Sequence, residues 1–329
     1  MCIRDRLSRV ADNLYWMSRY VERAESLARL VEVRRDTRLE TGFGIQSKKF
    51  WSSSLSALYA EEFFQADGRT EADEFILFAE NWPNSIRNCI YFARENARMV
   101  RDQLSDEIWV ELNNTYLFFQ SGDAKKTFKQ SPSHFSQRII RFSLVFQGLV
   151  DATVHHDEGW RFISLGKYLE RADQTSRILD TLSLIGSEPS RTDLIGALRT
   201  CSALSAYRKR FRGELSLRNV AEFLLFSQDF PRSMRFAIRR IDSYLHEISG
   251  VPSGNFSNEA ERLIGSTLAT VNFTDIATLM DKGLHQSIDE LQTKLIEVGQ
   301  RIFETYVLLP FEIESVSQKM AEQTQAQQQ

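Results

Sequence analysis

Two stretches of the chain place carboxylates and arginines at helical spacing. Each stretch reads acid, acid, arginine, acid at intervals of three, four and three residues: Glu22, Glu25, Arg29 and Glu32, then Glu170, Asp173, Arg177 and Asp180. On a helix these intervals put all four side chains on one side. Arg23 and Arg171 directly follow the first glutamate of each stripe. Carboxylates and guanidinium groups in this pattern can form ion pairs, hold a metal ion, or bind and act on a ligand.

All three kinds of chemistry remain open on the residues alone. The structural interpretation, which we favour, is a ladder within each helix, Glu25 to Arg29 and Asp173 to Arg177, that also reaches arginines on neighbouring helices. A metal site would use carboxylate pairs from facing helices, but such bundles also need a Glu-x-x-His motif, which is absent. We therefore predict no metal and no cofactor. The third interpretation is a polar cavity that binds a ligand or a partner's charged group.

A second polar cluster contains Arg94, Glu95, Asn96, Arg98 and Arg101. Its three arginines recur at i, i+4 and i+7, so they form a basic row along one helix face. The row could receive a phosphate or carboxylate through bidentate contacts, or it could pair with the acidic stripes, which we favour.

The arginine row has no counterpart in the second half of the chain. Asp242 and His246 stand where Arg94 and Arg98 would be repeated. This asymmetry suggests that one half holds a ligand site and the other is scaffold.

The two acidic stripes belong to a longer internal similarity with an offset of 148 residues. Between Glu74–Ile90 and Glu222–Ile238, 8 of 17 positions are identical. Two separate matches that share one offset predict a tandem duplication. Pro83 and Pro231 are matched and are expected to open helices, where a missing N–H is harmless.

The apolar periodicity predicts an all-α protein. We expect a bundle of about twelve helices in two pseudo-repeats of about six, at 7–40, 49–65, 70–80, 83–104, 106–120, 133–156, 158–185, 191–212, 216–228, 231–248, 257–281 and 283–308. We expect residues 1–6 to be a non-native leader, 7–156 the first repeat, and 157–313 the second repeat, packed with the first as one domain. The glutamine-rich residues 314–329 read as a disordered tail.

The composition and the missing motifs leave several classes of function without support. A net charge of −3 gives no support for binding nucleic acid or an anionic membrane. Three scattered cysteines suit the reducing cytoplasm, and no apolar run approaches the length of a bilayer span. Nucleotide-binding loops and the common hydrolase motifs are absent.

Several long segments resemble the bacterial alpha-E family, an all-helical domain of unknown biochemical function. These segments are Leu14–Glu25, Asn81–Ile86, Ala93–Asp102, Asp157–Phe162, Leu165–Asp173 and Asp229–Ser233. The similarity runs from Leu7 to about Glu312. In this resemblance the glutamates of the family fall at Glu22, Glu25 and Glu170, and Ser18 stands where the family more often has glycine.

The resemblance also implies a functional context. Alpha-E genes tend to neighbour, or fuse with, a circularly permuted ATP-grasp protein and a transglutaminase-like cysteine peptidase. We therefore expect an accessory or binding partner of such a system in peptide or amide-bond synthesis or modification. The alternative is an enzyme that uses Glu22 or Glu170 as general base, with a raised pKa, and the arginine row to hold an anionic peptide-like substrate. The sequence leaves the oligomeric state open.

Overall fold

The computed structural model describes residues 3–41, 45–185 and 188–308, with the side chains of 8–36, 51–185 and 188–308. Within these ranges the protein is all-α, as the periodicity predicts. The first eight helices are α1 (Ile3–Thr41), α2 (Ile45–Ala57), α3 (Glu61–Asp67), α4 (Ala72–Phe78), α5 (Ile86–Met99), α6 (Asp106–Gln120), α7 (Asp123–Gln130) and α8 (Pro132–Thr153), with a 3₁₀ turn at Arg101–Gln103. The others are α9 (Glu158–Ser183), α10 (Arg191–Thr200), α11 (Leu204–Phe211), α12 (Leu217–Phe226), α13 (Met234–Ser249), α14 (Glu259–Phe273), α15 (Ile276–Lys282) and α16 (Leu284–Tyr306). The proposed tail 314–329 lies outside the described residues.

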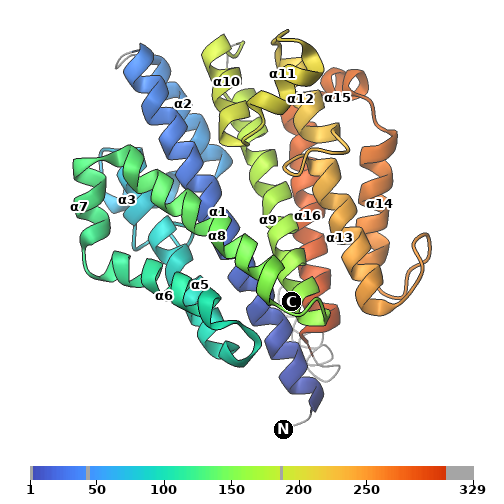
Figure 1. The fold of residues 1–329 in the computed structure, drawn as a ribbon. Coiled ribbons are helices and arrows are strands. Elements are labelled where there is room, and N and C mark those ends of the chain that lie inside the picture. Colours follow the sequence, from blue (N-terminus) through green and yellow to red (C-terminus); the bar gives the residue numbers. More distant parts are fainter. Residues whose placement is uncertain (1–2, 42–44, 186–187, 309–329) are drawn as a thin grey trace, which may run out of the picture.

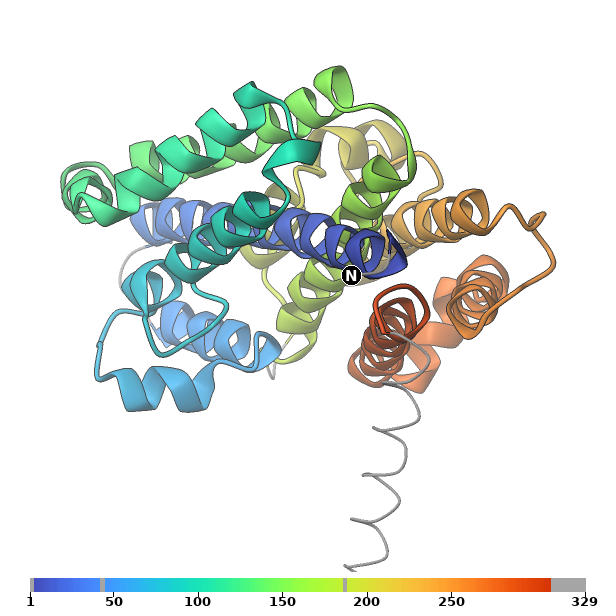
Figure 2. The same ribbon diagram turned by 90° about the horizontal axis from the view of Figure 1, so that it is seen from below.

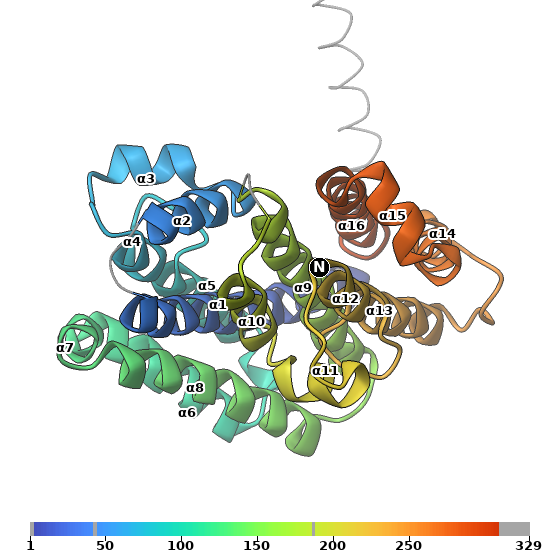
Figure 3. The ribbon, with the colours of Figure 1, turned by 90° about the horizontal axis from the view of Figure 1, so that it is seen from above.

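Two long helices, α1 and α9, form the centre of the molecule and pack against each other (Figures 1 and 3). The apolar seam of α1 explains its position, because residues such as Met17, Val21 and Ala24 are completely or almost completely buried. Helices α5 and α8 also pack on α1, as α13 and α16 pack on α9. Seen from below in Figure 2, the helices up to α8 gather around α1 on one side and α13 to α16 lie on the other.

The order of helices and their packing partners recur along the chain. Helix α5 packs on α6 as α13 packs on α14, and α7 packs on α8 as α15 packs on α16. This recurrence has the form that a duplication would produce, and the duplication itself stays a prediction.

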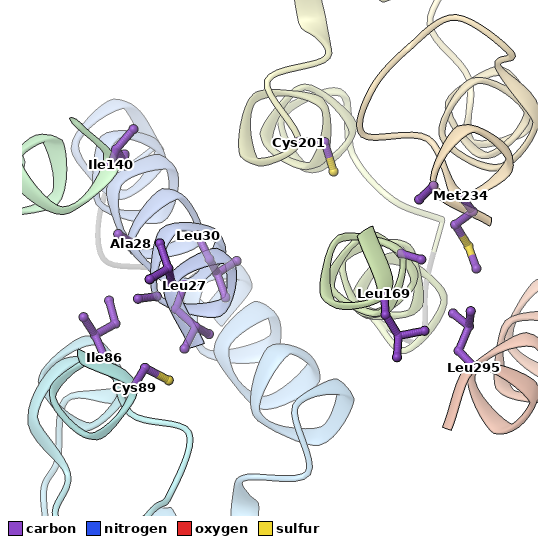
Figure 4. Close-up of a cluster of buried hydrophobic side chains, with 14 of the residues drawn as sticks. Leu27, Ala28, Leu30, Ile86, Cys89, Ile140, Leu169, Cys201, Met234 and Leu295 are labelled. Carbon is purple, nitrogen blue, oxygen red and sulfur yellow. The ribbon is translucent and has the colours of Figure 1, made fainter. Parts of the chain in front are cut away.

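The apolar core has one focus around each central helix. Figure 4 shows Leu27 and Ala28 of α1 close to Ile86 and Cys89 of α5, while Leu169 of α9 lies near Leu295 of α16. Trp82 and Phe75 stack at 5.3 Å between ring centroids in the first half.

The two central helices come closest at Gly166. A Cβ atom built there would lie 2.2 Å from the carbonyl oxygen of Tyr15, a contact that real Cβ atoms do not make. Only glycine therefore fits at this crossing without moving backbone. Ser18 stands at the matched position of α1 and is buried as well.

The number of helices is a correction, since the described residues contain sixteen α-helices rather than about twelve. Three of the expected helices are broken, and α7 was not expected. The helix expected at 257–281 is divided between α14 and α15, and the other two breaks lie at Tyr59 and Ser202, which adopt φ values of 52° and 54°. At both breaks the next amide, of Ala60 or Ala203, bonds to the carbonyl five residues back, which is the Schellman helix ending. This ending usually carries glycine, so these two breaks have no sequence signal.

The matched prolines do not open helices, contrary to the prediction. Ser85 and Ser233 are the N-caps of α5 and α13, and Pro83 and Pro231 lie in the preceding turns. Each serine hydroxyl accepts a bond from the amide three residues on and donates to the carbonyl six residues back. The turn therefore fixes the residue between proline and serine, Asn84 in one half and Arg232 in the other.

None of the described helices alone is long and apolar enough to cross a bilayer. One pair, α14 with α15, meets the length and composition only together and is bent by 101°.

Candidate functional site

The two Glu-Arg dipeptides of the acidic stripes exchange partners between α1 and α9. Arg23 donates from Nε and Nη2 to the two carboxylate oxygens of Glu170, at 2.6 and 2.8 Å. Arg171 donates in the same way to Glu22, at 2.9 and 2.8 Å. Both contacts are bidentate, which is the strongest arrangement of a guanidinium and a carboxylate.

Each glutamate has a second arginine. Arg19 of α1 donates to Glu170 at 2.9 Å, and Arg232 donates to Glu22 at 3.0 Å. Arg232 also reaches Glu25 at 2.5 Å. We call this set the Glu–Arg lattice; with the flanking arginines described next, it comprises Glu22, Glu25, Glu170, Asp173, Arg19, Arg23, Arg29, Arg171, Arg177 and Arg232.

The outer part of the lattice is the ladder predicted within each helix. Arg29 pairs with Glu25 at 2.8 Å, and Arg177 pairs with Asp173 at 2.7 Å. Amide and hydroxyl groups fill the remaining acceptor positions: Gln147 donates to Glu22 at 2.9 Å, Gln174 to Glu170 at 2.9 Å and Ser143 to Glu25 at 2.7 Å. The buried charges are thus both paired and hydrogen-bonded, as burial requires.

The surroundings fix the charge state of the central glutamates. Glu22 and Glu170 are 1% and 0% exposed. Burial alone would raise the pKa of each, but the paired arginines outweigh it and lower both pKa values from 4.5 to about 2. The expectation of a raised pKa is therefore wrong, and neither carboxylate is suited to accept a proton as a general base near neutral pH.

The arginine row does not join the lattice, contrary to our favoured interpretation. It also does not lie on one helix, because α5 ends at Met99 and Arg101 belongs to the following 3₁₀ turn. Arg94 pairs with Glu95 at 2.5 Å and lies over the rings of Trp109 and Tyr116. Arg98 pairs with the same Glu95, and the remaining members bond locally, Arg101 to Asp106 and Asn96 to the carbonyl oxygen of Phe92. The row faces α6 and solvent because α5 buries its opposite, apolar face, which includes Ile86, Cys89 and Ile90.

A cavity of about 300 Å³ opens beside the lattice and is lined by residues of both halves. Its polar lining comes from Arg23, Asn84, Asp173, Gln174 and Arg177. The apolar wall contains Leu27, Leu58, Tyr59, Phe63 and Trp82. Two arginines and two amides thus face an open space with aromatic walls, an arrangement typical of a ligand site.

Asn84 and Arg232 occupy matched turns but make different contacts with the lattice. In the second half the long Arg232 extends from its turn to Glu22 and Glu25. In the first half the short Asn84 reaches only Arg23, whose Nη1 donates to it at 2.5 Å, and the cavity lies next to it. The difference between Asn84 and Arg232 is visible in the sequence, because the proline before and the serine after each residue are the same in both segments.

The sequence reasoning did not identify Arg19, Arg232, Gln147 and Ser143 as parts of the site. Ser143 and Gln147 lie on α8, more than a hundred residues from their glutamates, and no spacing rule connects them.

Other reactive chemistry is not assembled in the described residues. They contain no group of three or more His, Cys, Asp or Glu side chains placed to hold a metal ion. Burial raises the pKa of both Cys89 and Cys201 to about 12, so neither thiol is activated as a nucleophile.

The comparisons with known proteins identify the family. The sequence model of Alpha-E, described as a predicted alpha-helical domain with a conserved ER motif, matches residues 7–307. The chain belongs to the Alpha-E family. This Alpha-E chain contains two Glu-Arg dipeptides in its acidic stripes, at 22–23 and 170–171. The arginine of each dipeptide pairs with the glutamate of the other.

The similar curated proteins add no function. The chain is 26% identical over 333 residues to uncharacterized proteins of Mycobacterium bovis and Mycobacterium tuberculosis, over 92% of its own length. It spans only 37% of the length of these relatives. No solved structure matches the chain.

Proposed function

We propose that this Alpha-E chain is an accessory binding protein, not the catalyst, of a peptide or amide-bond system. Its partners would be a circularly permuted ATP-grasp ligase and a transglutaminase-like cysteine peptidase, the associations that the family resemblance implies. The observation that carries the proposal is the state of the lattice: its four carboxylates are all paired with arginine, yet a cavity opens beside two of those arginines.

The charge of the lattice favours an anionic ligand. Its six arginines outnumber its four carboxylates, and Lys167 lies close enough to lower the pKa of Glu22 further. The lining of the cavity contains two arginines, Arg23 and Arg177, and only one carboxylate, Asp173. Asp173 is already held by Arg177 through both oxygens, at 2.7 and 3.0 Å. A carboxylate, such as the end of a peptide, would find guanidinium N–H donors there.

The remaining lining fits a peptide. Asn84 and Gln174 supply amide groups, and Tyr59, Phe63 and Trp82 supply apolar area for a side chain. Tyr59 and Phe63 are 63% and 38% exposed, so they can cover a ligand that enters from solvent.

Two further points support the partnership. Most of each mycobacterial relative lies outside the matched region, which leaves room for a fused partner domain. Buried, unactivated Cys89 and Cys201 agree with a cysteine-dependent step that belongs to the partner. Because an ATP-grasp ligase consumes ATP, we place the system in the cytoplasm.

The test is binding of the purified chain to the ATP-grasp protein and, separately, to its peptide product, by titration calorimetry. Asn84→Arg places arginine, the residue found at the matched position 232, beside the cavity. The longer side chain should fill the cavity, so peptide binding should weaken at least tenfold. The matched control is Asn114→Arg on the exposed face of α6, which should bind like the wild type. Absence of binding to both ligase and product would reject the proposal.

A further inference from the structure

A second cavity, of about 390 Å³, lies between α13, α14 and the loop that joins them, at the right of Figure 1. Asp242 and His246 line it from α13, Phe256 from the loop, and Gly265 and Asn272 from α14. It shares no lining residue with the cavity beside Arg23. The ligand chemistry of this cavity is therefore a separate question from the proposed function.

His246 is buried with an unused ring nitrogen. The residue is 9% exposed, and its Nδ1 has no hydrogen-bond partner among the described residues. Its other nitrogen, Nε2, lies 3.6 Å from Oδ1 of Asp242, too far for a hydrogen bond. With a proton on Nε2, next to the carboxylate, Nδ1 offers a lone pair and lacks a donor. A buried polar atom left in this way points to a group that the structure does not contain.

Asp242 also lacks a full counter-charge. Within the described residues, the only basic side chain within 4.0 Å of Asp242 is that of His246. Burial raises the pKa of Asp242; His246 opposes this increase and Glu261 adds to it. The carboxylate thus faces the cavity without the arginines that surround Glu22 and Glu170.

The other charged groups of the lining are already engaged. Glu261 accepts the backbone amide of Ser257 at 2.6 Å and the side-chain amide of Asn258 at 2.9 Å. Arg262 pairs with Glu259 at 2.6 Å. Of the titratable side chains in the lining, Asp242 and His246 remain, and both Asp242 and Nδ1 of the neutral imidazole are acceptors.

We propose that this cavity binds a primary ammonium group carried on an apolar body. The ammonium group has three N–H donors and one positive charge, which suit a carboxylate and an imidazole lone pair together. Phe256 and Phe273 line the same cavity and are 59% and 91% exposed. They offer aromatic area for the apolar body and ring faces for a cation. The site would thus have the opposite charge preference to that proposed for the cavity beside Arg23.

The probe is benzylammonium, titrated into the full chain and followed by calorimetry and by NMR shifts of α13 and α14. Benzyl alcohol has the same body without the charge, and benzoate has the opposite charge. We expect benzylammonium to bind at least tenfold more tightly than either. Equal binding of the alcohol, or tighter binding of benzoate, would overturn the proposal.

Two variants test the site without relying on one substitution. Asp242→Asn keeps the shape of the side chain and should weaken benzylammonium binding at least tenfold, whereas Asp289→Asn on the exposed face of α16 should leave it unchanged. Gly265 provides the steric test, because a Cβ atom there would lie 3.7 Å from Oδ1 of Asp242. Gly265→Ala should retain binding and Gly265→Leu should abolish it. Wild-type affinity in both Asp242→Asn and Gly265→Leu would also overturn the proposal.

Discussion

The Glu–Arg lattice and the arginine row contain the same residue types at similar helical spacing, but they hold different parts of the molecule together. In the lattice, Arg23 and Glu170 are 147 residues apart, and Arg232 and Glu22 are 210 apart. In the row, Arg98 bonds Glu95 three residues away and Arg101 bonds Asp106 five residues away. Of these two regions, only the lattice ties the two halves together. Ion pairs therefore contribute to this fold according to what they connect and how deeply they are buried.

The largest effect is expected from removing a central carboxylate. Glu170→Gln leaves Arg19 and Arg23 buried without their counter-charge, and Glu22→Gln does the same to Arg171 and Arg232. Each should lower the free energy of unfolding by about 3–5 kcal/mol. Urea unfolding followed by circular dichroism measures the loss. A loss below about 1 kcal/mol in both variants would show that the lattice does not hold the halves together.

Acid should weaken the lattice in a defined pH window. The pKa values of Glu22 and Glu170 are lowered from 4.5 to about 2 in the folded protein. Between these values the unfolded chain binds more protons, so stability is present above pH 4.5 and is lost as the pH falls toward 2. The loss should be about 3 kcal/mol for each carboxylate. Unfolding at pH 7, 4 and 3 tests this, and Glu170→Gln should show a weaker pH dependence than the wild type.

A smaller effect is expected when the second half is made to resemble the first. Arg232→Asn removes one arginine from Glu22 and Glu25, but each keeps its other arginine, Arg171 or Arg29. The free energy of unfolding should fall by about 2 kcal/mol. A second cavity should then open beside Arg171, detectable by crystallography. An unchanged midpoint would mean that Arg232 contributes nothing beyond the central pairs.

The smallest effect is expected on the arginine row. The side chain of Arg98 is 55% exposed and pairs only with Glu95 of its own helix. Arg98→Gln should change the free energy of unfolding by no more than about 0.5 kcal/mol. The same urea titration measures it, and a loss comparable to that of Glu170→Gln would erase the distinction between the two regions.

Much of the architecture could be predicted from the sequence, because apolar periodicity is a local property. The expected helix at 106–120 coincides with α6, and the long helices α1 and α9 lie where the seams predict them. The breaks at Tyr59 and Ser202 could not be predicted, since both residues occupy a left-handed position usually taken by glycine.

The candidate site was predicted only in part, because spacing along one helix predicts contacts within that helix but not contacts between helices. The ladders from Glu25 to Arg29 and from Asp173 to Arg177 follow from spacing within one helix. The exchange between Arg23 and Glu170 depends on how α1 and α9 cross, which periodicity does not specify. The expectation that the row from Arg94 to Arg101 pairs with the acidic stripes was wrong, because an exposed row of arginines and a buried one have the same spacing in the sequence.

The contact at Gly166 has a consequence for communication between the two cavities. Sliding α9 along α1 would bring a residue with a Cβ atom against the carbonyl oxygen of Tyr15, so this contact opposes translation of one helix along the other. The separation of the two cavities should therefore change little when either one is occupied. The protein would then hold an anionic ligand in one cavity and a cationic ligand in the other at a fixed distance.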